Sequence, residues 1–360
     1  MDKHRFPYEW TLRDAIFTKD KGKVFSCFAC GGGSSFGYKL AGFDVIGMNE
    51  IDPKMAEAYI VNHNPKYYFI EPIQTFKLRK DLPKELYNLD ILDGSPPCSS
   101  FSMAGNREKD WGKEKKFREG QANQVLDNLF FDFIDLAKEL QPKVVVAENV
   151  KGLLQGNAIK YVREIYRQFD LAGYYCQHWL LDASKMGVPQ RRERVFFICL
   201  RKDLAKPFLI QKDLFTVVPK LDLMFNEPKI PYENIEELNG VSATKMFPSI
   251  EKHWNNTKIG NSFSDSYKNE SGKDGWFNYI KLNPKNVLAT INAHTNGGGE
   301  YHYSECRGLS KLELCKGGSY PINYNFLQLN PKYLIGMSVP PVMVAQISTE
   351  IYSQWLNKLQ

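Results

Sequence analysis

Apolar and polar positions follow two different periods along the first 200 residues of this chain. Short apolar runs that stop at glycine- or proline-containing turns predict buried β-strands. Longer stretches with apolar residues three or four positions apart predict helices. The predicted strands are residues 24–29, 44–48, 90–92, 143–147 and 195–200, and the predicted helices are residues 36–41, 53–63, 121–140 and 341–359.

Strands that alternate with helices predict an α/β fold, in which parallel strands are joined by helical crossovers. Ligands bind beyond the carboxyl ends of the strands in such sheets. Three chemically useful side chains, Glu50, Cys98 and Glu148, fall at or just beyond predicted strand ends. We therefore expect these side chains to lie along one edge of the sheet.

The pattern changes after residue 200, where Pro, Gly, Asn, Ser and aromatic residues are scattered and periodicity is weak. This change predicts a second, irregular domain. The expected organisation is an N-terminal extension (1–22), a main domain (23–200), an irregular domain (201–326) and a C-terminal return to the main domain (327–360).

Composition narrows the class of protein. The 360 residues are 43% hydrophobic and 24% charged, which is typical of a globular chain. The net charge of +6 permits a polyanionic partner without requiring one. No apolar run reaches the roughly 18 residues of a membrane-spanning helix, so no span is expected. Seven scattered cysteines and a charged N-terminus without an apolar signal core favour the cytoplasm.

The glycine-rich turn after the first predicted strand favours a ligand that contains a nucleoside. Gly31, Gly32 and Gly33 let the backbone approach a ligand closely and aim helix amides at it. Glu50 follows about twenty residues later, where an acid suits the two hydroxyls of a ribose. The nicotinamide fingerprint is not met, because Phe36 occupies its third glycine position. A tight structural turn is the plainer alternative.

Cys98 is a candidate nucleophile. Two prolines precede it at a predicted strand end, so its backbone is rigidly placed among small polar residues. A small buried side chain is the alternative interpretation. Cys27 and Cys30 have redox spacing, but Cys27 lies inside a predicted strand, so structural cysteines are favoured there.

Further candidates follow two other predicted strands. Glu148 ends the strand at 143–147, and a buried carboxyl can donate a proton to a ring nitrogen. Arg192 and Arg194 lie two positions apart at the start of the strand at 195–200. Alternate residues of a strand share a face, so both arginines could grip one anion or carbonyl oxygen. A pair of ordinary surface arginines is the alternative.

Taken in order, these motifs closely resemble those of the DNA (cytosine-5) methyltransferases. The resemblance covers residues 24–200 and the chain from Thr290 onward. It rests on Phe28-Ala29-Cys30-Gly31-Gly32-Gly33, Asn49-Glu50-Ile51-Asp52, Pro96-Pro97-Cys98 with Phe101-Ser102, Leu129-Phe130-Phe131, Glu148-Asn149-Val150, the set Gln190, Arg192 and Arg194, and Gly336 with Val339-Pro340. The chain departs from the usual family residues at Cys30, Pro72, Ser99, Leu126 and Met337.

The resemblance implies a Rossmann-like, S-adenosylmethionine-dependent methyltransferase sheet with a smaller, irregular target-recognition domain at 201–326. It implies four catalytic residues, Cys98, Glu148, Arg192 and Arg194. The implied cofactor, S-adenosylmethionine, would be bound by Phe28, Gly31, Gly33, Glu50, Ile51, Pro97, Leu129, Ser338 and Val339. No metal is required, and the sequence has no cluster of ligand-spaced His and Cys.

The implied reaction transfers a methyl group to carbon 5 of cytosine in a specific short sequence of double-stranded DNA, through a covalent Cys98 adduct on a flipped base. Residues 105–120, with six basic and four acidic side chains, would close over the base. The recognition segment offers polar candidates for base contacts that the sequence does not rank, namely Asn255, Asn256, Lys258, Asn261 and Lys268.

Several alternatives remain open at this point. The same chemistry could act on RNA, or the chain could be a non-catalytic DNA-binding relative. A nicotinamide-dependent dehydrogenase is a third alternative, but it predicts neither Pro97-Cys98 nor Glu148-Asn149. The expected setting is a monomer in the bacterial or phage cytosol, associated with the nucleoid. Whether a partner restriction endonuclease acts on the same site is left open.

Overall fold

The computed structural model describes residues 4–97, 128–156, 158–213, 216–238, 248–294 and 298–359. Cys98 and the charged segment 105–120 therefore lie outside the described residues. The chain divides into two compact units, which we name the sheet unit and the second unit. The sheet unit comprises Ile16–Leu181, Glu193–Met224 and Val344–Gln360, and the second unit comprises Met1–Ala15, Asp182–Arg192 and Phe225–Met343.

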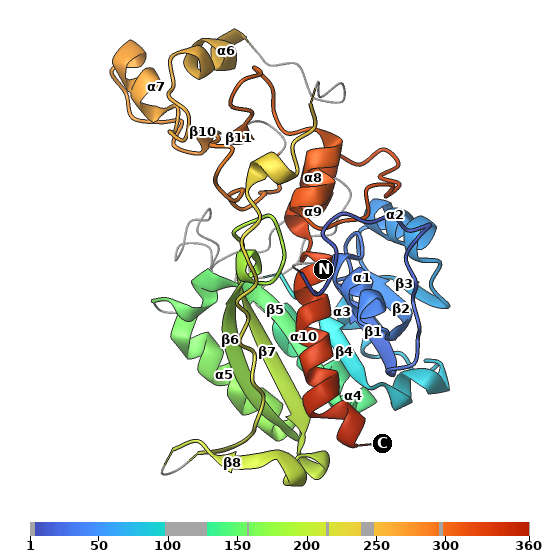
Figure 1. The fold of residues 1–360 in the computed structure, drawn as a ribbon. Helices are drawn as coiled ribbons and strands as arrows, with labels where there is room; N and C mark the ends of the chain where they lie inside the picture. Colours follow the sequence, from blue (N-terminus) through green and yellow to red (C-terminus); the bar gives the residue numbers. More distant parts are fainter. Residues whose placement is uncertain are drawn as a thin grey trace. The chain divides into compact units, whose positions relative to one another are not determined.

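A seven-stranded sheet organises the sheet unit (Figure 1), with the strand order β3-β2-β1-β4-β5-β7-β6. Its strands are β1 (Lys23–Cys27), β2 (Asp44–Glu50), β3 (Tyr67–Ile70), β4 (Ile91–Gly94), β5 (Val144–Val150), β6 (Tyr174–Asp182) and β7 (Glu193–Arg201). From β3 to β5 every neighbouring pair is parallel. The carboxyl ends of β2, β1, β4 and β5 therefore lie along one edge, which is the Rossmann-like arrangement that the sequence predicts.

One strand departs from the expected parallel arrangement, because β7 runs antiparallel to β5. Apolar periodicity reports which face of a strand is buried but not its direction, so this reversal has no signal in the pattern. The chain also contains β3, β6 and the helix α5 (Ala158–Leu171), for which the sequence analysis made no prediction.

Helices cover both faces of the sheet. The remaining helices of the sheet unit are α1 (Gly33–Leu40), α2 (Pro53–His63), α3 (Ile73–Phe76), α4 (Leu129–Leu140) and the part of α10 (Pro341–Gln354) from Val344 onward. The unit also contains the short 3-10 turns η1 (Lys84–Asn88), η4 (Lys151–Leu154), η6 (Lys202–Leu204), η7 (Lys206–Phe208) and η9 (Leu356–Lys358). A separate two-stranded sheet is formed by β8 (Leu209–Gln211) and β9 (Val217–Pro219). The prediction at 53–63 coincides with α2.

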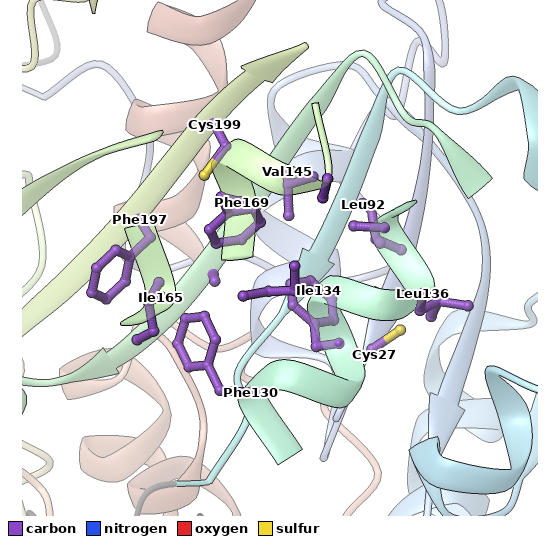
Figure 2. Packing of buried hydrophobic residues seen from close by; sticks show 14 of the residues in the cluster. Cys27, Leu92, Phe130, Ile134, Leu136, Val145, Ile165, Phe169, Phe197 and Cys199 are labelled. Carbon is purple, nitrogen blue, oxygen red and sulfur yellow. The ribbon is translucent and has the colours of Figure 1, made fainter. Parts of the chain in front are cut away.

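The main hydrophobic core lies between the sheet and helices α4 and α5 (Figure 2). Strand register aligns Phe25, Leu92, Val145 and Cys199 in one row across β1, β4, β5 and β7. All four side chains are fully buried in this core. The neighbouring row contains Ser26 of β1 and Asp93 of β4. Because successive side chains of a strand point to opposite faces, this row lies on the other face of the sheet. This second row faces α1, whose Tyr38 hydroxyl donates a hydrogen bond to Asp93.

The apolar stretch Pro331–Lys358 passes a length and composition test for a membrane span, with a mean hydropathy of 1.3. However, 89% of its apolar window is buried inside the folded chain. Its hydrophobicity is accounted for by packing, as in the core helix of a globular protein.

The second unit has little regular structure. It contains α6 (Pro248–Asn255), α7 (Ser264–Ser271), α8 (Lys311–Gly317), α9 (Pro331–Met337), the turns η5 (Ala183–Lys185) and η8 (Tyr232–Asn234), and the parallel pair β10 (Tyr279–Lys281) and β11 (Gly299–Tyr301). A fully buried ion pair helps to hold it together, because both Arg307 Nη atoms donate to Glu313 at 2.8 and 2.9 Å. The Tyr232 hydroxyl also donates to Glu313 at 2.6 Å.

The boundaries of the two units differ from those expected. Residues 201–224 group with the sheet, and the irregular unit extends to Met343. Part of the expected N-terminal extension packs into the second unit, because the Trp10 indole donates to the Ser319 carbonyl at 3.0 Å. These differences arise because pairing partners distant in sequence, which periodicity does not report, decide where a segment packs.

Candidate active site

A left-handed glycine turn joins β1 to α1. Phe28 and Cys30 have φ angles of 52° and 49°, and Gly32 has a φ of 83°. The Gly32 amide donates to the Ala29 carbonyl at 2.8 Å, which closes the turn. Gly32 is also the N-cap of α1, and no side-chain hydrogen bond caps this helix start. The turn therefore presents backbone at the carboxyl end of β1, as a ligand cradle requires.

His63 explains why a glycine stands at position 32. Its buried imidazole stacks between Phe36 and Tyr59, with ring centroids 3.8 and 4.2 Å away. A Cβ atom on Gly32 would lie 2.0 Å from His63 Nε2. Burial lowers the pKa of His63 well below its ordinary value, and the nearby Lys39 ammonium lowers it further. The ring is therefore neutral at pH 7, and it packs directly against the turn at Gly32.

We expect Gly32→Ala to destabilise the sheet unit. The left-handed backbone alone costs an alanine about 1–2 kcal/mol, and the clash with His63 adds to that cost. Gly173→Ala is the matched control, because Gly173 has a φ of 92° but open space around its Cβ position. Urea unfolding should show the larger loss for Gly32→Ala. Equal losses for both variants would contradict the role of His63.

Glu50 ties the end of β2 to the glycine turn. Its Oε2 accepts a hydrogen bond from the Cys30 amide at 2.7 Å. Its Oε1 accepts from the amides of Ile51 and Asp52 at 2.8 and 2.9 Å. Burial raises the pKa of Glu50, and these backbone donors oppose the rise. A carboxylate is thus held at the sheet edge beside the turn, where it can accept further hydroxyl donors.

A buried ion pair lies near the carboxyl end of β5. Arg194 Nε is 2.9 Å from Glu148 Oε1, and both side chains are largely shielded from solvent. Burial lowers the pKa of Arg194, and the Glu148 carboxylate opposes that change. The structure therefore brings these two predicted site residues together.

Asn149 links this ion pair to the segment before Cys98. The buried Asn149 amide nitrogen donates to the Pro96 carbonyl at 3.1 Å. Pro96 is two residues before Cys98, which itself lies outside the described residues. The end of β5 is therefore anchored to the beginning of the predicted catalytic loop.

Arg192 has different partners from Arg194, which corrects the expectation that the two grip one group. Arg192 precedes the first residue of β7, and its guanidinium donates to the carbonyls of Ile291 and Gly336 at 3.2 and 3.0 Å. It is buried within the second unit. Backbone carbonyls already occupy these donors, so Arg192 braces that unit.

The other predicted cofactor residues divide between the units. Phe28 packs on the core cluster that contains Leu129, and Gly31 and Gly33 are buried in the turn. Ile51 and Pro97 are half-buried in the same unit. Ser338 and Val339 are buried in the second unit, where the Ser338 hydroxyl donates to the Leu334 carbonyl at 2.8 Å. The structure thus brings the residues near the ends of β1 and β2 together within one unit.

Two residues of this region were missed by sequence reasoning. His63 has no motif, and only its position under Gly32 reveals its role. Asp93 directly follows the predicted strand at 90–92, and in the structure it is a buried carboxyl of β4 beside Ser26. The signal available for Asp93 was an acid inside an otherwise apolar strand.

Comparison with known proteins shows what this chain is similar to. The family described as C-5 cytosine-specific DNA methylase matches residues 22–353. Type II methyltransferase M.NgoPII of Neisseria gonorrhoeae is 27% identical over 91% of this chain and 95% of its own length. Type II methyltransferase M.FnuDI of Fusobacterium nucleatum is 37% identical over 51% of this chain and 48% of its own length. A solved structure described as a prophage DNA modification methyltransferase (E. coli) has a TM-score of 0.63 at 20% identity, covering 92% of this chain and 99% of its own.

Proposed function

The chain belongs to the C-5 cytosine-specific DNA methylase family and is a DNA (cytosine-5-)-methyltransferase, and on that premise we propose how its residues carry out the reaction. The methyl donor is S-adenosylmethionine, and the acceptor is carbon 5 of a cytosine flipped out of a specific short sequence of double-stranded DNA. The observation that carries the proposal is the buried Glu148–Arg194 pair. The next residue, Asn149, is hydrogen-bonded to Pro96, which precedes Cys98 by two positions in the sequence.

The glycine turn and Glu50 fit this cofactor. The turn leaves backbone amides without a side-chain cap at the start of α1, where they can face a ligand. The Glu50 carboxylate accepts the ribose hydroxyls, while Phe28, Ile51, Pro97 and Leu129 line the adenosine site. The resemblance also names Ser338 and Val339 as candidates for cofactor binding. The cofactor supplies a methyl group on a sulfonium sulfur.

Glu50→Ala is expected to weaken cofactor binding and to leave DNA binding unchanged. Two charge-assisted hydrogen bonds are worth about 2–5 kcal/mol together, which is about 30-fold to several-thousand-fold in affinity. Glu57→Ala is the control, since Glu57 is an exposed carboxylate on α2. Calorimetry with S-adenosylhomocysteine measures the effect. An unchanged affinity in Glu50→Ala would refute the assignment of this residue.

Carbon 5 of cytosine becomes a nucleophile only after attack at carbon 6. Cys98 forms the sulfur–carbon 6 bond and moves electron density toward carbon 5. Glu148 donates a proton to ring nitrogen 3 and accepts a hydrogen bond from the exocyclic amine. Arg194 holds the base carbonyl. After methylation, carbon 5 loses its proton to solvent, the sulfur–carbon 6 bond breaks, and ring nitrogen 3 returns its proton to Glu148, which releases the product and the thiolate.

The target base must leave the duplex before Cys98 can reach it, at a cost of a few kcal/mol. We assign the closing of the site over that base to residues 105–120, which lie outside the described residues. Their six basic side chains provide phosphate contacts. Arg192 is assigned a positioning role, since it fixes the backbone at Ile291 and Gly336 in the second unit.

Sequence recognition is assigned to the irregular part of the second unit. Residues 201–300 carry 13 basic and 12 acidic side chains, so net charge alone gives no preference for DNA here. The candidate base-reading side chains are all exposed, as direct contact with bases requires, namely Asn255, Asn256, Lys258, Asn261 and Lys268.

We further propose that the enzyme is a monomer that works on cytoplasmic DNA and protects sites which a partner restriction endonuclease would cut.

Bisulfite sequencing of DNA from cells that produce the protein tests this function. We expect protected cytosines at one position of one short sequence, and none in cells that produce Cys98→Ala. Complete conversion of plasmid and chromosomal DNA, with methylated cytosine found in RNA instead, would overturn the choice of DNA as substrate.

A further inference from the structure

Asp93 is a buried carboxyl that this proposed mechanism leaves without a task. It is 3% exposed and is the penultimate residue of β4. Its Oδ2 accepts a hydrogen bond from the Ser26 hydroxyl at 2.8 Å, and its Oδ1 accepts from the Tyr38 hydroxyl at 3.1 Å. Burial raises the pKa of Asp93 to about 7, with the two hydroxyls opposing the rise and Glu148 adding to it.

Other buried carboxylates of this chain have stronger partners. Glu313 is paired with Arg307, and Glu148 is paired with Arg194. Glu50 accepts three backbone amides. Among the described groups that shift the pKa of Asp93, none is a cation. Because a buried charge is unfavourable without a compensating partner, Asp93 is suited to a cation that arrives with a ligand.

The position of Asp93 limits which ligand can bring that cation. The strand order β2-β1-β4-β5 places Asp93 between the glycine turn after β1 and Glu148 of β5. Glu50 lies at the end of β2, two strands from β4, or about 10 Å across the sheet. A ligand whose ribose lies at Glu50 and whose reactive end lies toward Glu148 therefore passes β4 on the way.

We propose that Asp93 is the anionic partner of the ammonium group on the amino-acid arm of the cofactor. This inference rests on the proposed function, because it takes the ligand to be S-adenosylmethionine. An ammonium offers N–H donors, and each Asp93 oxygen has accepting capacity beyond its one hydroxyl hydrogen bond. The sulfonium has no such donor and could interact with Asp93 only through its charge.

Calorimetry on the full-length protein separates this role from a structural one. S-adenosylhomocysteine carries the ammonium, whereas 5′-methylthioadenosine lacks the whole amino-acid arm. We expect Asp93→Asn to weaken S-adenosylhomocysteine about 10- to 100-fold, the range for a charge-assisted hydrogen bond. Binding of 5′-methylthioadenosine should change less than about twofold. Ser26→Ala, which removes one partner of Asp93 but keeps its charge, should give a smaller loss.

The unmodified protein provides a second measurement that does not depend on folding of a variant. Within the described part of the chain, the groups that interact with Asp93 are Ser26 and Cys27 of β1, Tyr38 of α1, Tyr59 of α2 and Glu148 of β5. Protonation of Asp93 removes the negative charge that holds the ammonium. Affinity for S-adenosylhomocysteine should therefore fall as the pH drops below about 7, while affinity for 5′-methylthioadenosine stays level.

Two results would overturn the inference. One is an Asp93→Asn variant that binds S-adenosylhomocysteine as tightly as the unmodified protein, or that loses both ligands equally. The other is the same pH dependence for both ligands in the unmodified protein. Failure of the unmodified protein to bind either ligand at any pH would instead refute the proposed function on which the inference rests.

Discussion

Replacing Cys98 by alanine is expected to abolish methyl transfer while sequence-specific DNA binding survives. Without the thiolate, carbon 6 is not attacked and carbon 5 stays a poor nucleophile toward a methyl sulfonium. Loss of a covalent nucleophile reduces turnover by about 10⁴-fold or more. Steady-state transfer of labelled methyl groups measures the loss, and a gel-shift titration measures DNA binding.

A duplex with 5-fluorocytosine at the target gives the same prediction a direct chemical readout. Fluorine cannot leave carbon 5 as a proton does, so the sulfur–carbon 6 bond persists and the protein stays attached to the DNA. The unmodified protein should form this denaturation-resistant complex, and Cys98→Ala should not. Cys176→Ala, which removes a half-buried thiol of β6, is the control and should trap normally. Trapping by Cys98→Ala would show that another nucleophile acts.

Glu148→Gln is expected to lower kcat by about 10²–10⁴-fold, the usual contribution of a positioned general acid. Glutamine keeps the size and hydrogen-bonding capacity of the side chain but cannot donate a proton to ring nitrogen 3. Affinity for S-adenosylhomocysteine should hardly change, since we assign Glu148 to the base and not to the cofactor. Single-turnover kinetics with saturating DNA separates this chemical defect from weaker binding.

Glu193→Gln is a matched control for Glu148→Gln. Glu193 begins β7 and pairs with Lys151 at 2.9 Å, with both side chains 42% exposed. Its loss should leave kcat within about twofold, because exposed ion pairs contribute little. A thermal melt of each variant shows how much stability the Glu148–Arg194 pair provides. A normal kcat in the Glu148→Gln enzyme would show that Glu148 is not the general acid.

Much of the sheet could be predicted because its strands carry their own signals. The runs that became β1, β2, β4 and β5 end at glycine or acidic residues near the observed ends, and α2 begins with the proline expected at a first turn. The strand β3 could not be found this way, because its side chains are alternately half-buried and exposed and none is fully buried. Its place is decided by pairing with β2.

The elements of the second unit could not be predicted because its core is not built from periodic apolar residues. Glu313 pairs with the nearby Arg307 and accepts a hydrogen bond from Tyr232, which lies 81 positions away in the sequence. From the sequence alone, these polar side chains would be predicted to lie on the surface. A cluster of Ile250, Phe263 and Tyr301 adds aromatic packing from short, irregular elements. Only tertiary contacts distinguish such residues from exposed ones.

The residues of the candidate site also divide into those that the sequence signals and those that only tertiary contacts reveal. Glu50, Glu148 and Arg194 could be proposed because chemically active side chains at strand ends have few structural reasons to be there. Arg192 was paired with Arg194 by spacing alone, and the structure gives it backbone carbonyl partners instead. His63 packs against Gly32, and Asp93 accepts hydrogen bonds from two hydroxyls on other elements. Sequence spacing reports neither relationship.

The central claim is that this protein methylates carbon 5 of cytosine in DNA, and one measurement tests it most directly. The purified protein is incubated with S-adenosylmethionine labelled in the methyl group, together with either duplex DNA or total RNA. Each nucleic acid is then digested and its nucleosides are separated. The account predicts label in 5-methyldeoxycytidine from the DNA, no label from RNA, and none from either with Cys98→Ala. Label on an exocyclic amine, or label confined to RNA, would contradict it.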